Sequence, residues 1–217
     1  MKKTDAYLKK LKKNNNKEWF DKSRPAYEEA REEFRLIIEE VLKSVIKFDK
    51  EVASLEAKKT LFRINRDIRF SKDKTPYKTN FAADMSPGGK NSMRPGYYLS
   101  AQPGNYFLAG GSYMPMPDKL AAIRQEIDYN FKDFQKIMAQ KDFKKYFGGI
   151  SDEGKLVNPP KGYEKDNPAA EILKNKHFIV YHKVPDKIAL SPKFPKYAAD
   201  VFKAMHPFLV FLRKAVE

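Results

Sequence analysis

The chain has 217 residues, of which 41% are hydrophobic and 33% charged, a composition typical of a globular protein with its own core. Its 43 lysines and arginines outnumber 28 aspartates and glutamates, which gives a net charge of +15 and favours anionic partners. No apolar run approaches the roughly 18–20 residues of a membrane-spanning helix, no apolar leader opens the sequence, and cysteine is absent. We therefore expect a single cytoplasmic domain over residues 1–217.

The first elements are predicted to be helical. Leu8 and Leu11 indicate a short helix, and a second helical turn follows a break at residues 14–16. Apolar residues then recur at spacings of three and four over residues 25–48, after a start signal at Ser23. This pattern predicts a long helix against which the shorter ones pack.

At residue 61 the apolar spacing changes from helical to alternating. One side of an extended chain then carries the apolar residues Phe62, Ile64, Ile68 and Phe70, and only Arg66 interrupts this set. The other side consists of polar residues, namely Arg63, Asn65, Asp67 and Arg69. We predict that residues 61–70 form a central strand whose polar face is a binding surface, and that Arg66 is structural, buried against a carboxylate or helix carbonyls.

Three more strands are predicted, around residues 77–85, 97–102 and 106–110. Pro103 and Gly104 fit a tight turn between the last two. Such a turn opposes residues whose numbers sum to 207, so Tyr98 and Phe107 share one face while Leu99 and the other apolar residues form the better core.

The second half alternates between helices and irregular chain. Helices are predicted from about residue 118, over 131–139, 143–147 and 169–174, and finally over 195–216, with a kink at Pro207. Residues 148–166 are predicted to be irregular, and residues 178–184 to be a strand. The fold class is therefore α+β, an antiparallel sheet of at least four strands packed by long N- and C-terminal helices.

The densest group of charges lies between residues 58 and 78, where eight basic residues accompany two acidic ones. Arginines can bind carboxylate or phosphate oxygens through two donors, and lysines add mobile charges. The candidate ligand-binding residues are Arg63, Asn65, Asp67, Arg69, Lys72, Lys74, Tyr77 and Lys78. The alternative is an internal salt-bridge network in which Arg63, Arg66 and Arg69 pair with Asp67, Asp73, Asp84 and helix glutamates.

No reaction can be assigned from these residues. Asp67 is the one weak candidate for a catalytic base, but a carboxylate among cations has a lowered pKa and is a poor base. His177, His182 and His206 lack the spacing of metal ligands, so no metal site is predicted. No phosphate-binding glycine loop or nucleophile motif indicates a cofactor or an enzyme class.

Several segments resemble a known family in the same order along the chain. They are NRDIRFSKDKTPYKTNF at residues 65–81, LKKLKKNNNKEWF at 8–20, PGYYL at 95–99, residues 110–117, NPPKGY at 158–163 and NPAAEILKNK at 167–176. The chain is thereby identified as a member of the bacterial and fungal family named domain of unknown function 2461. The resemblance covers nearly the whole chain and implies no reaction.

Three functions stay open at this point. The leading hypothesis is the binding of a phosphorylated small molecule or nucleotide in a cationic pocket on a sheet face. The second is a nucleic-acid-binding module that stacks bases on Tyr98, Tyr106, Phe107 or Tyr113. The third is an interaction scaffold without a ligand.

Overall fold

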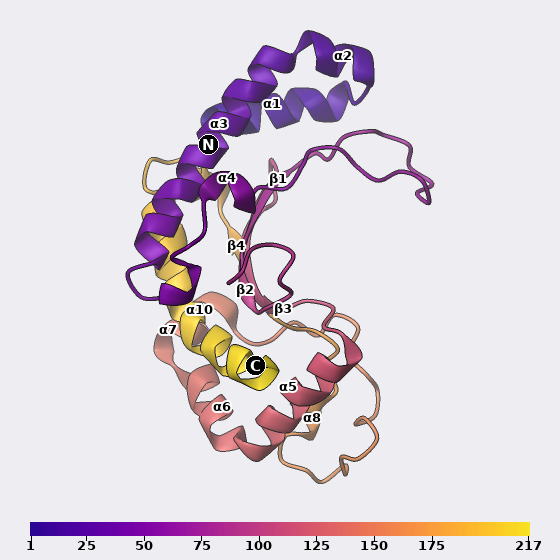
Figure 1. Ribbon diagram of the computed structural model, residues 1–217, viewed down its shortest axis with the longest axis vertical. Helices are drawn as coiled ribbons and strands as arrows, with labels where there is room; N and C mark the ends of the chain where they lie inside the picture. Colours follow the sequence, from indigo (N-terminus) through magenta and orange to yellow (C-terminus); the bar gives the residue numbers. More distant parts are fainter.

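The sheet has four antiparallel strands in the order β1-β2-β3-β4, so each strand pairs with its neighbour along the chain. This computed structural model describes residues 1–217. The strands are β1 (Phe81–Met85), β2 (Gly96–Ala101), β3 (Tyr106–Ser112) and β4 (Phe178–Val184). Helices surround the sheet (Figure 1), which confirms the predicted α+β class.

Helices precede the sheet, separate β3 from β4 and follow β4. They are α1 (Lys2–Lys13), α2 (Lys17–Lys22), α3 (Arg24–Val45), the short 3-10 helix η1 (Lys50–Val52), α4 (Ala57–Thr60), α5 (Pro117–Tyr129), α6 (Phe131–Ala139), α7 (Lys141–Phe147), α8 (Ala170–Leu173), α9 (Asp186–Ala189) and α10 (Phe194–Val216). None of them combines the length and the hydropathy that crossing a membrane requires.

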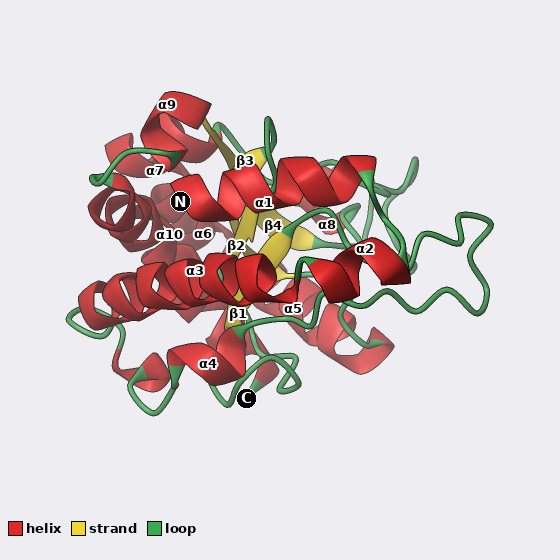
Figure 2. Ribbon diagram, turned by 90° about the horizontal axis from the view of Figure 1, so that it is seen from above, coloured by secondary structure: helices red, strands yellow, loops and turns green.

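The two longest helices cover one face of the sheet. Helices α3 and α10 contact each other, α3 also contacts β1, and α10 contacts β3. Figure 2 shows α3 lying across the sheet from above. On α3 the buried positions Ala30, Phe34, Ile38 and Val41 repeat every three or four residues, so one stripe of the helix faces the core. Helix α10 continues through Pro207.

The turn between β2 and β3 forms where the sequence predicts it. The Asn105 backbone N–H donates to the Gln102 carbonyl over 2.8 Å, and Gly104 has a φ of +77° that favours glycine. The resulting pairs, such as Leu99 opposite Leu108, confirm the predicted register.

This register divides the hairpin into two faces. Tyr97, Leu99 and Leu108 are buried toward the helices, whereas Tyr98 and Phe107 are partly exposed on the opposite face. The predicted sorting of core and surface residues is thus confirmed for the two central strands.

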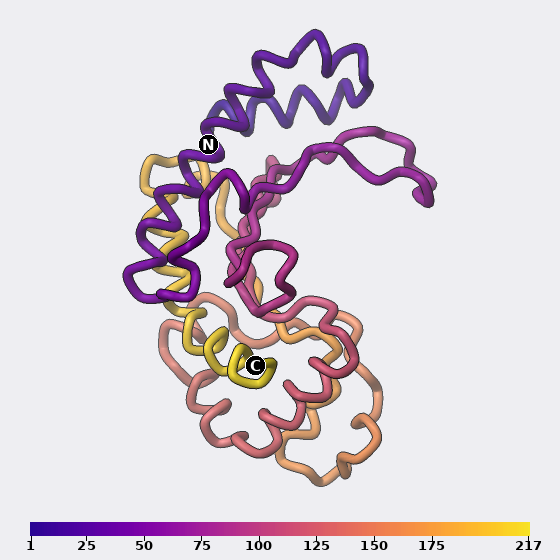
Figure 3. Tube along the Cα trace, in the orientation of Figure 1, coloured from indigo at the N-terminus to yellow at the C-terminus, as the bar shows by residue number.

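Residues 61–70 are not a strand of the sheet, so the prediction of a central strand here is wrong. They make only isolated bridges, Leu61 to Ala83 and Asn65 to Tyr77. With the residues that follow, they form an irregular ribbon, the arm (residues 61–80), which leaves the body beside β1 (Figure 3). Ile64 is buried, but Phe70 is 95% exposed. The returning segment 71–76 offers no large apolar side chain, so the alternating residues of the outgoing half have nothing to bury against.

Candidate functional site

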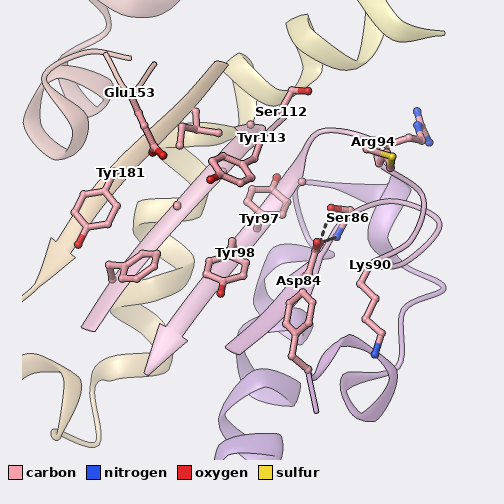
Figure 4. A pocket seen from close by; sticks show the side chains of 18 residues that line it. Asp84, Ser86, Lys90, Arg94, Tyr97, Tyr98, Ser112, Tyr113, Glu153 and Tyr181 are labelled. Carbon is pink, nitrogen blue, oxygen red and sulfur yellow. Dashed lines mark hydrogen bonds between the residues drawn. The ribbon is translucent and has the colours of Figure 1, made fainter. Parts of the chain in front are cut away.

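The sheet face opposite α3 and α10 forms one side of a cavity of about 580 Å³, a size suited to a metabolite. Its walls come from the loop between β1 and β2 with Lys90 and Arg94, from the start of the arm with Phe62, and from the chain after α7 with Glu153. Figure 4 shows side chains from these segments around one opening. We refer to this cavity as the sheet-face pocket.

The sheet contributes a row of aromatic rings to the pocket. Tyr98 of β2 stacks on Phe107 of β3 with centroids 5.8 Å apart, and Phe107 lies 4.8 Å from Tyr181 of β4. These three residues form the aromatic floor. Phe62 of the arm lies 6.1 Å from Tyr98 and extends the apolar surface beyond β1. A planar ligand ring can stack on such a surface through dispersion and its own quadrupole.

Asp84 of β1 is the acidic group beside the aromatic floor, directly opposite Tyr98 in the strand register. Its Oδ1 accepts hydrogen bonds from the Ser86 hydroxyl at 2.5 Å and the Ser86 backbone N–H at 2.9 Å. Burial raises the pKa of the Asp84 carboxyl, although the bonds from Ser86 act in the opposite direction. Burial, together with the nearby Asp84, also raises the pKa of Tyr98.

Three cations lie near the β1 side of the pocket, and of these Lys90 lines it, whereas Lys78 and Arg63 do not. Lys78 Nζ and Lys90 Nζ lie 5.5 and 5.8 Å from the centroid of the Phe62 ring, as in cation–π contacts. Burial lowers the pKa of Lys78, and the positive charges of Arg63 and Lys90 lower it further. Arg66, Arg69 and Arg94 each have a carboxylate partner, whereas Arg63, Lys78 and Lys90 have none. We call Arg63, Lys78 and Lys90 the cation cluster.

The structure separates the predicted ligand-binding residues into two groups. Arg63 and Lys78 belong to the cation cluster beside the pocket, although neither lines it. Tyr77 is buried in the root of the arm, where its ring stacks on Phe20 at 4.0 Å, and Asn65 pairs with it across the ribbon. The remaining residues, Asp67, Arg69, Lys72 and Lys74, lie farther along the arm and do not line the pocket.

Within the arm, the alternative of an internal charge network applies in part. Arg66 donates to Asp73 at 2.5 Å and to the Thr75 carbonyl at 3.1 Å, so the predicted carboxylate partner is confirmed, but the predicted burial is wrong because one quarter of the side chain is exposed on the projecting arm. Asp73 has a pKa lowered to about 2 by hydrogen bonds from Thr75 and from Arg66. The network crosslinks the two halves of the arm.

Asp67, the weak candidate for a catalytic base, forms an ion pair with Arg69. Its two carboxylate oxygens accept from Arg69 Nε and Nη2 at 3.0 and 2.7 Å. These bonds from Arg69 lower the pKa of Asp67, and the side chain is exposed outside the pocket. Neither Asp73 nor Asp84 joins it, because Asp73 pairs with Arg66 and Asp84 with Ser86.

The four aromatic residues expected to stack bases also separate. Tyr98, Phe107 and Tyr113 line the pocket. Tyr106 does not, because it points to the core face, where its hydroxyl donates to Asp5 at 2.6 Å and is buried. Its position on β3 is one residue out of phase with the open face.

A buried charged network holds the loop between β1 and β2 that walls the pocket. Arg213 of α10 donates through Nε to the Pro95 carbonyl at 2.9 Å and pairs through Nη1 with Asp49 at 2.9 Å. Tyr97 donates to Asp49 at 2.8 Å, and its oxygen lies 2.9 Å from His206 Nδ1. Since the tyrosine proton is used on Asp49, His206 must carry a proton on Nδ1 to complete the chain of hydrogen bonds.

The structure shows no group of three or more histidines, aspartates or glutamates placed to hold a metal ion. His182 bonds the Tyr146 carbonyl and the Tyr197 hydroxyl, and His177 accepts from the Met114 backbone. Each histidine therefore has protein partners in a different part of the fold.

Comparison with known proteins gives one match. The family model described as conserved hypothetical protein (DUF2461) matches residues 3–211. The chain belongs to this family. No curated protein and no solved structure matched the chain. The DUF2461 match spans the arm, the whole sheet and most of α10, so the pocket lies inside the family region, whereas Arg213 of the buried network lies just beyond its end.

Sequence reasoning missed several pocket residues in this DUF2461 chain. Asp84 was considered only as a partner for arginines, and Lys90, Glu153 and Tyr181 were not singled out. A signal for Asp84 was present, since it is the one charged residue in the apolar strand FAADM, followed by the loop beginning Pro87-Gly88-Gly89-Lys90. Glu153 and Tyr181 come from segments far along the chain, and no local pattern links them to the hairpin.

Proposed function

We propose that the sheet-face pocket binds a nucleotide or a closely similar phosphorylated aromatic metabolite. The observation that supports this most directly is the combination of an aromatic floor with a cation cluster beside it. A planar base can stack on Tyr98, Phe107 and Tyr181, which stand side by side across three strands. The phosphate can then meet Arg63, Lys78 and Lys90, none of which forms a salt bridge with a protein carboxylate.

The Asp84 carboxyl supplies the polar recognition expected in such a pocket. Its raised pKa follows from burial, so Asp84 holds a proton to higher pH than an exposed aspartate. In either protonation state it can hydrogen-bond the edge of a base stacked next to Tyr98, as donor to a ring nitrogen or as acceptor from an amino group. We assign no reaction to the pocket.

The proposal is tested by titrating the protein with nucleoside 5′-monophosphates, followed by calorimetry and by thermal shift, because a ligand that binds only the folded state raises the melting temperature. The parent nucleosides and inorganic phosphate serve as partial ligands. We expect the monophosphate to bind more tightly than either part, since ring and phosphate use different halves of the pocket.

Two variants with matched controls locate the binding. Tyr181→Ala should weaken binding by about 1–3 kcal/mol through lost stacking, and Lys90→Gln by about 1.5–3 kcal/mol through a lost charge-assisted bond. Tyr129→Ala and Lys132→Gln remove exposed side chains of the same types outside the pocket and should change nothing. The proposal is wrong if Tyr181→Ala and Lys90→Gln bind every monophosphate as tightly as the unmodified protein does. It is also wrong if the unmodified protein binds no nucleoside monophosphate.

A further inference from the structure

The arm is a preformed projection with its own internal bonds. The Arg66 backbone N–H donates to the Pro76 carbonyl at 2.9 Å and the Lys78 N–H to the Ile64 carbonyl at 2.8 Å, which joins the outgoing and returning halves. The Arg66 side chain adds its bond to Asp73. These bonds hold the two halves of the arm together, although most of its length is exposed.

The root of the arm is fastened to the turn between α1 and α2. The Asn15 side chain accepts from the Tyr77 backbone N–H at 3.0 Å and donates to the Tyr77 carbonyl at 2.9 Å, as a neighbouring strand would. The ring of Phe20 stacks on that of Tyr77. Figures 1 and 2 show the arm leaving the body beside this corner.

The tip of the arm presents an aromatic ring to solvent. Phe70 is 95% exposed, more than any other large hydrophobic residue of the chain. The guanidinium of Arg69 lies 5.8 Å from its ring centroid, and Lys72 follows without a carboxylate partner. Exposing a phenylalanine costs solvation free energy, so its place at the end of an ordered projection points to a contact with another molecule.

Unpaired positive charge surrounds this projection. The last turn of α1 carries Lys10, Lys12 and Lys13, and none of them pairs with a carboxylate, whereas Lys9 pairs with Asp5 and Lys17 with Asp21. These lysines lie at the same α1–α2 corner that holds the arm root. Lys72 adds an unpaired positive charge at the tip of the arm, close in sequence to the exposed Phe70.

Three kinds of partner could meet an exposed ring among cations. A second copy of the chain is disfavoured because each copy has a net charge of +15. A membrane surface attracts cations, but stable insertion needs an apolar face, and the tip offers one phenylalanine beside Asp67 and Asp73. Single-stranded nucleic acid fits best, because its unpaired bases stack on aromatic rings while its phosphates pair with lysines.

We propose that the arm and the α1–α2 corner bind single-stranded nucleic acid, with Phe70 stacked on a base and Lys72 and the α1 lysines on phosphates. This surface is separate from the sheet-face pocket and does not depend on what the pocket binds. Stacking on Phe70 and pairing of lysines with phosphates do not read the edges of bases, so we expect little sequence preference.

The test measures the fluorescence anisotropy of a labelled 12-nucleotide oligothymidylate over a range of NaCl concentrations. Contacts with about four phosphates should give a log-log slope of roughly −3. Phe70→Ala should weaken binding between about fivefold and a hundredfold at every salt concentration, without changing the slope. Lys72→Gln should make the slope shallower by about 0.7. Because both side chains are exposed, neither variant should affect folding.

Val157→Ala is the matched control, since Val157 is 88% exposed and lies outside the arm. Equal binding by Phe70→Ala and the unmodified protein would overturn the proposal. So would a Phe70-dependent association with phosphatidylserine vesicles, or a Phe70-dependent dimer in gel filtration, without oligonucleotide binding. Mononucleotide titrations of Phe70→Ala keep the two proposals distinct, because pocket binding should be unchanged in this variant.

Discussion

Replacing Arg213 by methionine should destabilise the protein strongly. Arg213 is 1% exposed and its Nη1 lies 2.9 Å from Asp49, which is 2% exposed. Methionine keeps much of the apolar stem but leaves the Asp49 charge buried without its cation. The substitution also removes the bond from Nε to the Pro95 carbonyl, which holds the loop at the pocket.

Removing one partner of a buried ion pair costs about 3–5 kcal/mol. In a chain of this length, each kcal/mol corresponds to about 2–4 °C in melting temperature, so the expected fall is roughly 6–20 °C. Circular dichroism during urea and thermal unfolding measures it. Asp49→Asn combined with Arg213→Met should recover part of the loss, because the stranded charge is then absent.

The network also predicts how stability depends on pH. Burial would raise the pKa of Asp49, but hydrogen bonds from His206 and Tyr97 and the charge of Arg213 hold it well below its usual value. The ionised carboxylate therefore stabilises the fold above the unfolded-state pKa of about 4, and this contribution is lost as the pH falls toward the folded-state pKa. Asp49→Asn should flatten that acid decline.

The reasoning would be refuted if the free energy of unfolding of Arg213→Met lay within about 1 kcal/mol of that of the unmodified protein. Additive effects of the two substitutions, to within about 0.5 kcal/mol, would likewise show that the pair is not coupled.

Two further substitutions test the sheet. Asp84→Asn should raise the melting temperature at pH 7 but have less effect near pH 4. Burial raises the pKa of Asp84 in the folded state, so the ionised carboxylate opposes folding, and the free energy that this costs grows as the pH rises. An equal effect at both pH values would contradict this account of Asp84. Gly111→Ala should lower the free energy of unfolding by several kcal/mol, as measured by urea unfolding. Gly111 has a φ of +129°, and an added Cβ would collide with the Phe178 carbonyl of β4. The matched change Gly104→Ala has open space at its Cβ and should lower the free energy of unfolding by less.

Much of the fold could be predicted because local patterns and tertiary packing agree. The spacing of apolar residues predicted helices α3 and α10, and the Pro103-Gly104 turn fixed the register of the hairpin. That register determines which residues of β2 and β3 face the helices. The prediction for residues 61–70 was wrong because alternating apolar residues indicate an extended chain but do not show which segment it pairs with. The segment is extended, but Asn65 pairs with Tyr77 of the same arm instead of a sheet strand.

The candidate site was predicted less well for a related reason. Tyr98 and Phe107 followed from the hairpin register, and Arg63 and Lys78 from their charge. Lys90 reaches the same place from a loop, and Tyr181 from β4, which begins 66 residues after the end of β3. Such convergence depends on tertiary contacts that no short stretch of sequence specifies.

Irregular chain covers part of both outer edges of the sheet, and the root of the arm is one of these covers. The Phe62 backbone N–H donates to the Ala82 carbonyl at 3.0 Å along the free side of β1, and the Ser151 N–H donates to the Ile179 carbonyl at 2.9 Å along the free side of β4. Irregular chain thus occupies part of both outer strands. Unpaired outer strands are templates on which other molecules add strands and aggregate. In this protein, a foreign strand would first have to displace the arm or the segment after α7, so the same residues that shape the pocket also guard the sheet against edge-to-edge association.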